Sequence, residues 1–511
     1  MTKLPFSEKV GYAVGDAAAN LVWRGALAYL AVFYTDTFGI TAAATAMLFL
    51  VVRLSDGVTD IIMGMIADRT KSRWGKFRPW ILFSAPVLGL FMVLCFSTPN
   101  FSENGKLVYA YFTYIGLTLA YTVNNVPYSA LMGVMTSSDT ERTSLSGFRF
   151  AGAFTGGLLV MGFLPKLVNH FGQGNDAVGY QTTMYIFAAI LVFLLVITFA
   201  STKERVTAST QSSLGLAQEL KDLTKNLPMI VLPLLAMSLF FYYRDIISGV
   251  FFISVLVAMR FIIKRFIQTP IEKLSSTQRD MVDLLTNKPW LILLALGFLT
   301  MMFNGVKYGV IAYYFKYYVG NELMTGQYFI ALLVVSIFGA LCTNYLAKRW
   351  GKPKLFIIAL LASSLFTIPF FWLEGDNITA IFVLGCCAEF FAAMLPTLYF
   401  TMLGDSADYS EWKNNRRATG LIYSAGTFVQ KTGGGFAGAL VLLVLAAYGY
   451  NGMDQSTIAA ALPGMKLLMS WIPAAFALIS ALLILLYPLS NERNQQIGKE
   501  LEIRRANAKD N

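Results

Sequence analysis

The chain has 511 residues, of which 56% are hydrophobic and only 14% are charged, and its mean hydropathy is +0.59. About a quarter of the residues of a soluble domain are charged, so this composition excludes an ordinary soluble domain. The net charge of +11 comes from Lys and Arg that gather in particular loops. This pattern is typical of the cytoplasmic loops of a membrane protein, and it argues against a nucleic-acid partner.

Apolar stretches recur along the chain, and each is long enough to cross a hydrocarbon core of ~30 Å as a helix. The sequence lacks the alternating strands of a membrane barrel, and lipid tolerates no open sheet. We therefore predict an all-α polytopic membrane protein with about 14 transmembrane helices. The expected spans are 11–34, 43–67, 80–97, 107–134, 147–165, 181–199, 228–243, 246–263, 289–317, 326–345, 355–373, 378–402, 421–448 and 466–487.

The first span carries a polar stripe. Asp16, Asn20 and Arg24 follow one another at steps of four residues, so they share one face of the helix, with Trp23 beside them. An aromatic ring next to amide and charged groups is a common platform for a sugar, although Trp23 could equally face lipid. We expect Asn20, Trp23 and Arg24 to contact a substrate.

The second span contains two carboxylates one helical turn apart, Asp56 and Asp60, with Arg53 nearby. Two carboxylates this close in a low-dielectric site repel, so one takes up a proton unless a cation lies between them. The pair predicts a site for a coupling cation. The alternative is that both carboxylates pair with Arg53 and only lock helices together.

A basic loop, 68–78, follows the second span. We expect it to lie in the cytoplasm, where its ion pairs with helix ends control the conformational cycle. Its proposed gating residues are Asp68, Arg69, Arg73 and Lys76.

The fourth span carries Tyr121, Thr122 and Asn125. Amides and hydroxyls at mid-membrane suit the hydroxyls of a sugar, which both donate and accept hydrogen bonds. Polar contact between helices is the alternative reading of these residues. Arg149, at the start of the fifth span, is a further charged residue at or near membrane depth.

In the second half, Lys431 lies deep in the span 421–448, where a desolvated ammonium needs a partner. Lys307 and Glu389 are also charged at membrane depth, and each could be a partner for another charged residue. A single histidine, His170, makes a zinc site or a histidine proton relay unexpected.

The chain divides into an N-terminal six-helix bundle (1–200), a linker with an inserted helical hairpin (201–288), a C-terminal six-helix bundle (289–490) and a tail (491–511). A second basic loop, 346–354, stands in the second half where 68–78 stands in the first. This weak repeat of two six-helix halves is typical of the major facilitator fold. Because the basic loops face inward, both termini are expected in the cytoplasm.

Several segments closely resemble the glycoside–pentoside–hexuronide:cation symporters, the melibiose permease-like family of the major facilitator superfamily. They are GYAVGDAAANLVWRGALAYLAVFYTDTFGI (11–40), RLSDGVTDIIMGMIADRTKSRWGKFRPW (53–80), YTVNNVPYSAL (121–131), GDSADYSEWKNNRRATG (404–420) and YSAGTFVQKTGGG (423–435). The resemblance covers nearly the whole chain apart from the hairpin.

The resemblance implies symport of a sugar with Na+, H+ or Li+ by alternating access of the two bundles. It assigns Asp56, Asp60, Thr122 and Thr59 to the cation site. It places Arg149 at the sugar cavity, and Thr427 and Lys431 on a helix next to both sites. Asn20 and Asn125 stand where melibiose permease has aspartates, and Thr59 and Ser129 replace an asparagine and an aromatic residue.

We therefore predict a cation-coupled importer of a sugar, glycoside or uronide, active as a monomer in the inner membrane. The missing carboxylates, together with Arg24 and Arg149, favour an acidic sugar or oligouronide. Neutral glycosides are the alternative substrates, and a major facilitator exporter or a lipid carrier is the alternative function. No nucleophile–base pair or phosphate loop is recognisable, so an enzyme is not expected.

Overall fold

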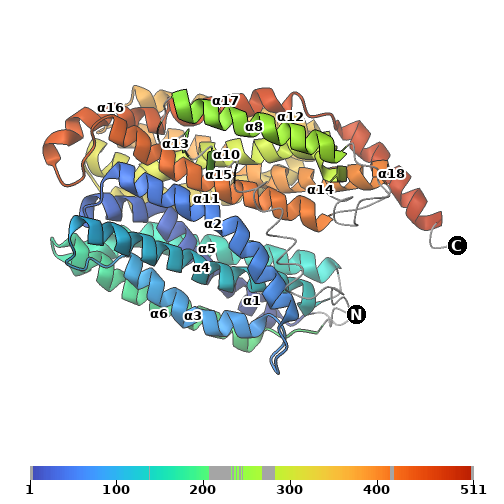
Figure 1. Cartoon of the computed structure of the whole chain (residues 1–511), viewed down its shortest axis with the longest axis horizontal. Coiled ribbons are helices and arrows are strands. Elements are labelled where there is room, and N and C mark those ends of the chain that lie inside the picture. Colours follow the sequence, from blue (N-terminus) through green and yellow to red (C-terminus); the bar gives the residue numbers. More distant parts are fainter. Residues whose placement is uncertain are drawn as a thin grey trace. The chain divides into compact units, whose positions relative to one another are not determined.

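The structure is a computed structural model that describes residues 4–136, 139–205, 246–267, 282–414 and 419–507, with a few isolated positions between 231 and 244. Every regular element in these ranges is helical (Figure 1), which confirms the predicted all-α class. Nine helical stretches in this part are long and apolar enough to cross a membrane. The predicted count of fourteen stays a prediction, because most of span 228–243 lies outside the described residues.

The helices of the first half extend past the apolar spans, because polar residues cap them outside the apolar stretch. Ser102 accepts a hydrogen bond from the Gly105 N–H, and Asn175 accepts one from the Val178 N–H. The helices are α1 (Phe6–Gly25), the π-helical turns η1 (Ala26–Leu30) and η2 (Phe33–Thr37), α2 (Ala42–Arg69), α3 (Arg78–Cys95), α4 (Glu103–Met135), α5 (Asp139–Gly172) and α6 (Asp176–Ser201).

Two of the later spans that we expected to be continuous are broken in the structure. Pro396 and Pro473 cannot donate to the carbonyl four residues earlier, so the helices are interrupted at Ala393 and Ser470. The elements are α8 (Ile246–Ile267), α10 (Lys288–Tyr313), η4 (Tyr314–Tyr318), α11 (Met324–Trp350), α12 (Lys352–Thr367), η5 (Ile368–Phe371), α13 (Ile378–Ala392), α14 (Met394–Asn414), α15 (Thr419–Ala447), η6 (Gln455–Thr457), α16 (Ile458–Met469), α17 (Trp471–Ile484) and α18 (Asn491–Asn507).

Contacts divide the chain into two compact units. Unit 1 comprises Met1–Leu235, Ile311–Ile330 and Leu442–Leu462, and unit 2 comprises Ala236–Val310, Ala331–Val441 and Pro463–Asn511. Helices α10 and α15 therefore begin in unit 2 and end in unit 1. The domain boundaries expected from the sequence stay predictions.

In unit 1, helix α1 packs against α5 at backbone distance. A Cβ added at Gly152 would lie 2.0 Å from the carbonyl oxygen of Ala13, and one at Gly156 would lie 2.1 Å from that of Ala17. Small residues four apart allow two membrane helices to approach closely. This contact brings the polar stripe of α1 next to the side chain of Arg149 on α5.

In unit 2, α12, α14 and α17 enclose an apolar core that includes Phe356, Leu398, Met402 and Ile484. Burial of such aliphatic and aromatic side chains stabilises the unit, since each contributes roughly 1.5–3 kcal/mol relative to exposure.

Candidate substrate and cation site

Four polar side chains form a continuous row on α1 and α5, which we call the polar ladder: Arg149, Asp16, Asn20 and Arg24. Its first contact is an ion pair in which Nε of Arg149 lies 3.4 Å from Oδ2 of Asp16. Asp16 is only 7% exposed, so its charge depends on this partner. Arg149 also donates from Nη2 to Oγ of Ser129 over 3.3 Å.

Asn20 is the centre of the ladder. Its Nδ2 donates to the main-chain oxygen of Asp16 over 2.9 Å, and its Oδ1 accepts from Nε of Arg24 over 3.2 Å. The Arg24 side chain runs over Gly157, where a Cβ would lie 2.4 Å from its Cδ, and its guanidinium lies 5.9 Å from the ring centre of Phe154. The ladder thus fixes the direction in which Arg24 points.

An aromatic pair adjoins the ladder. The rings of Trp23 and Tyr121 stack with centroids 5.5 Å apart and planes 27° apart, which joins α1 to α4. Asn125 lies one turn after Tyr121, and its buried Oδ1 has no hydrogen-bond partner among the described residues. An unpaired buried acceptor is costly unless a ligand or water supplies a donor.

The predicted cation residues lie on α2 and α4. Oγ1 of Thr122 donates to Oδ1 of Asp60 over 2.8 Å, so the structure brings these two residues together. Asp56, one turn earlier, is 7% exposed. Thr59 donates to the main-chain oxygen of Asp56 over 3.0 Å. Binding of a cation by these groups stays a prediction.

Other residues expected at the site lie in unit 2. Thr427 is exposed and Lys431 is half-buried on α15, and their roles stay predictions. Lys307 and Glu389 do pair with each other, with Nζ 2.9 Å from Oε2. Glu389 also accepts hydrogen bonds from Tyr308 and Ser336, and this stabilises a carboxylate that is only 5% exposed.

The basic loop is anchored by a residue that the sequence reasoning missed, Glu204. Its carboxylate accepts hydrogen bonds from the main-chain N–H groups of Lys76, Phe77 and Arg78 at 2.8, 2.8 and 3.1 Å. Gly75 is required here, because its φ is +106° and a Cβ would lie 2.4 Å from the carboxyl carbon of Glu204. An acidic residue directly after the sixth span, facing a basic loop, was the available signal.

Of the predicted gating residues, Arg73 places its guanidinium 4.4 Å from the ring centre of Trp74, and Lys76 reaches Glu204 through its main chain. The side chains of Asp68 and Arg69 lie outside the described part of the structure. Gating by this loop stays a prediction.

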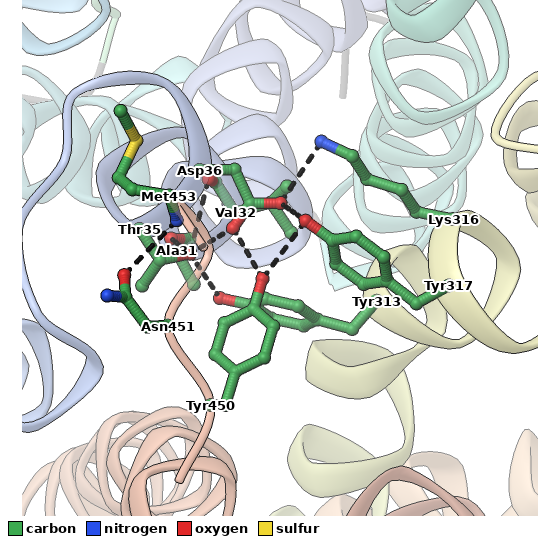
Figure 2. A network of polar contacts seen from close by, with 10 residues as sticks. All are labelled: Ala31, Val32, Thr35, Asp36, Tyr313, Lys316, Tyr317, Tyr450, Asn451 and Met453. Atoms are coloured by element: carbon green, nitrogen blue, oxygen red, sulfur yellow. Dashed lines mark hydrogen bonds and ion pairs between the residues drawn. The ribbon is translucent and has the colours of Figure 1, made fainter. Parts of the chain in front are cut away.

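A second group that the sequence reasoning missed, the Asp36 cluster, is built around Asp36 in the π-helical turn η2 (Figure 2). Its members are Asp36, Tyr313, Lys316, Tyr317 and Tyr450, and all of them belong to unit 1. Lys316 lies with Nζ 3.0 Å from Oδ2 of Asp36, and the Tyr317 hydroxyl donates to the same oxygen. The Tyr450 hydroxyl donates to Oδ1 over 2.6 Å.

The Asp36 carboxylate is only 2% exposed, and it joins three segments that are distant in sequence. Burial and the nearby Asp36 charge raise the pKa of Tyr450, so its hydroxyl stays protonated and continues to donate. Asp36 and Tyr317 both lie in π-helical turns, η2 and η4, a local geometry that is frequent at functional sites. Our predicted span ended at residue 34, which left Asp36 in a loop.

The described helices, nine of them long and apolar enough to cross a membrane, are typical of a polytopic membrane protein with polar groups buried in its interior. The family model described as "MFS/sugar transport protein" matches residues 11–244 and 241–491. The chain belongs to this family, and the resemblance to melibiose permease-like symporters is confirmed.

Curated relatives align along nearly the whole chain. The putative glycoside/cation symporter YagG of Escherichia coli is 32% identical over 99% of this chain and 97% of its own length. The isoprimeverose transporter of Lactiplantibacillus pentosus is 30% identical, covering 95% and 89%. The glucuronide carrier protein homolog of Escherichia coli is 27% identical, covering 97% and 95%.

A solved structure shows the same fold. It is a bacterial homologue of the human lysosomal transporter Spinster, inward-facing and unoccupied, with a TM-score of 0.65 at 14% identity, covering 95% of this chain and 98% of its own. The chain is therefore a multi-pass membrane protein with the major facilitator fold, and its relatives are named as transporters and symporters.

Proposed function

We propose that this protein is a cation-coupled symporter that carries a sugar, glycoside or uronide into the cell. One observation carries the proposal: two successive residues of α4 serve the two predicted sites. Tyr121 stacks on Trp23, and Thr122 donates to Asp60. A cation that changes the position of Thr122 changes the adjacent substrate platform, and this is what coupling requires.

The experiment is uptake of labelled sugar by membrane vesicles under imposed Na+ or proton gradients. We expect accumulation against the sugar gradient that stops when both ion gradients are collapsed. Accumulation that continues unchanged after collapse of both would rule out symport.

We further propose that the preferred substrate is acidic. The polar ladder contains two arginines and one carboxylate, and a guanidinium binds a carboxylate through paired hydrogen bonds. A relative is named as a glucuronide carrier homolog, whereas another is named as an isoprimeverose transporter. Displacement of a bound labelled glucuronide by neutral disaccharides at equal concentration would exclude the acidic substrate.

Transport would proceed by alternating access, with the protein acting as a monomer in the inner membrane and both termini in the cytoplasm. Two polar groups at opposite ends of unit 1 support the alternation. The Glu204 anchor holds the basic loop at one end, and the Asp36 cluster binds the ends of α10 and α15 at the other.

A further inference from the structure

The contacts of Asn20 differ from those expected of a residue that binds the substrate directly. Both heteroatoms of its amide are engaged inside the protein, one with the main chain of Asp16 and the other with Nε of Arg24. An amide held in this way supplies orientation to its neighbour. We propose that Asn20 is a positioning residue that holds Arg24 without neutralising it, and that it thereby selects a carboxylate-bearing sugar over a neutral one. This inference rests on the proposed function, transport of a sugar by this site.

The charges along the ladder are arranged unequally. Arg149 has an ionic partner, Asp16, at 3.4 Å. Arg24 has a neutral partner, because the atom that lies 3.2 Å from its Nε is an amide oxygen. The ladder as a whole holds two cations and one anion, and the excess positive charge therefore belongs to Arg24.

The geometry leaves Arg24 suited to an anion. Its hydrogen bond to Asn20 uses Nε, so its two Nη groups are the atoms with which a carboxylate forms a paired contact. Gly157 gives room for the side chain, and the Phe154 ring lies beside the guanidinium. Desolvation by these neighbours strengthens the attraction between Arg24 and a bound carboxylate.

Replacing the amide nitrogen of Asn20 by oxygen should weaken the preference for the anionic sugar. Aspartate has the same shape as asparagine, so Asn20→Asp places a full negative charge about 3.2 Å from Nε of Arg24. That carboxylate would compete with the carboxylate of the substrate. The net charge of the ladder would fall to zero. The affinity for a neutral sugar would then fall less than the affinity for an anionic one.

The test is equilibrium binding of methyl glucuronide and methyl glucoside, which differ at the C6 carboxylate, to the purified full-length protein in lipid nanodiscs. We expect the wild type to prefer the glucuronide, and Asn20→Asp to lower the ratio of the two affinities by about tenfold or more. Asn175→Asp is the control, because it adds the same charge at the exposed N-cap of α6, where an aspartate can still accept the hydrogen bond from the Val178 N–H, without the contact to Arg24. It should change the ratio much less.

A double-mutant cycle keeps the outcome decisive. In an Arg24→Gln background, which removes the cation, Asn20→Asp should leave the affinity ratio unchanged. An unchanged ratio in the Asn20→Asp variant, or an equal fall in Asn175→Asp, overturns the role of Asn20 while sugar binding stands. A wild type that prefers the glucoside overturns the selection of an anion. If the wild type binds neither methyl glucuronide nor methyl glucoside, and also binds no larger glycoside of either sugar, the proposed function itself is overturned.

Discussion

The proposed coupling of two solutes depends on single side chains. Asp60 accepts a hydrogen bond from Thr122, which fixes the orientation of its carboxylate. Asp56 is one turn away and 7% exposed, so the two carboxylates lie close together where a low dielectric disfavours ionisation of both.

We predict that Asp60→Asn abolishes accumulation of sugar against its gradient while exchange down the gradient persists. The amide removes the negative charge that a cation needs but leaves the shape of the site intact. Uptake and exchange in the same vesicles distinguish the two processes. Undiminished accumulation in this variant would show that the carboxylate pair has no part in coupling.

A milder change at the same site is Thr122→Val. The valine removes the hydroxyl that lies 2.8 Å from Asp60 but preserves the volume of the side chain. We expect the cation concentration for half-maximal transport to rise by about threefold to tenfold, with little change in sugar binding at saturating cation. Thr118→Val, which loses a hydrogen bond to the main-chain oxygen of Ile115 on its own helix, is the control and should leave that concentration nearly unchanged.

At the scale of elements, the ends of helices carry the contacts that sequence alone did not show. The all-α class and the apolar stretches were predictable because hydropathy acts locally, whereas the interruptions at Ala393 and Ser470 were not predicted. The sequence reasoning missed Glu204 and Asp36 because their partners lie 126 or more positions away along the chain. The polar stripe of α1 was predictable from a spacing of four, whereas its pairing with Arg149 depends on the close packing of α1 on α5.

We predict that Glu204→Ala loosens the basic loop and leaves the bundle folded. Three main-chain N–H groups lose their acceptor at once, and each unpaired group costs roughly 1–3 kcal/mol where water does not replace it. Trypsin should then cleave at Lys71 and Arg73 several times faster in inside-out vesicles. Substitution of the exposed residue Glu492 by alanine is a suitable control. Equal rates of trypsin cleavage in the wild type and in Glu204→Ala would show that Glu204 does not anchor the loop.

At the scale of the whole molecule, the Asp36 cluster is where helices that begin in unit 2 end in unit 1. Transport by alternating access requires such contacts to break and re-form, so their strength sets the balance between the conformations.

We predict that Asp36→Asn shifts this balance toward the conformation in which the cluster is open. The substitution removes the anion that Lys316 and two tyrosines share. A cysteine introduced at Ala31, which is 8% exposed, should then react several times faster with a membrane-impermeant maleimide. Asp454→Asn, which alters an exposed carboxylate near Tyr450, is the control and should leave the rate of maleimide labelling unchanged. An unchanged labelling rate in Asp36→Asn would show that the cluster does not gate the site.

The backbone contact between α1 and α5 has a thermodynamic consequence. Gly152 and Gly156 lie against the carbonyl groups of Ala13 and Ala17, where any side chain would clash, so the two helices pack at backbone distance. In the proposed transport cycle a helix pair packed this closely would move as one piece, and the ladder would present the same charges to a sugar on either side of the membrane. Any difference in affinity between the two sides then has to arise from the coupling ion or from groups outside this helix pair.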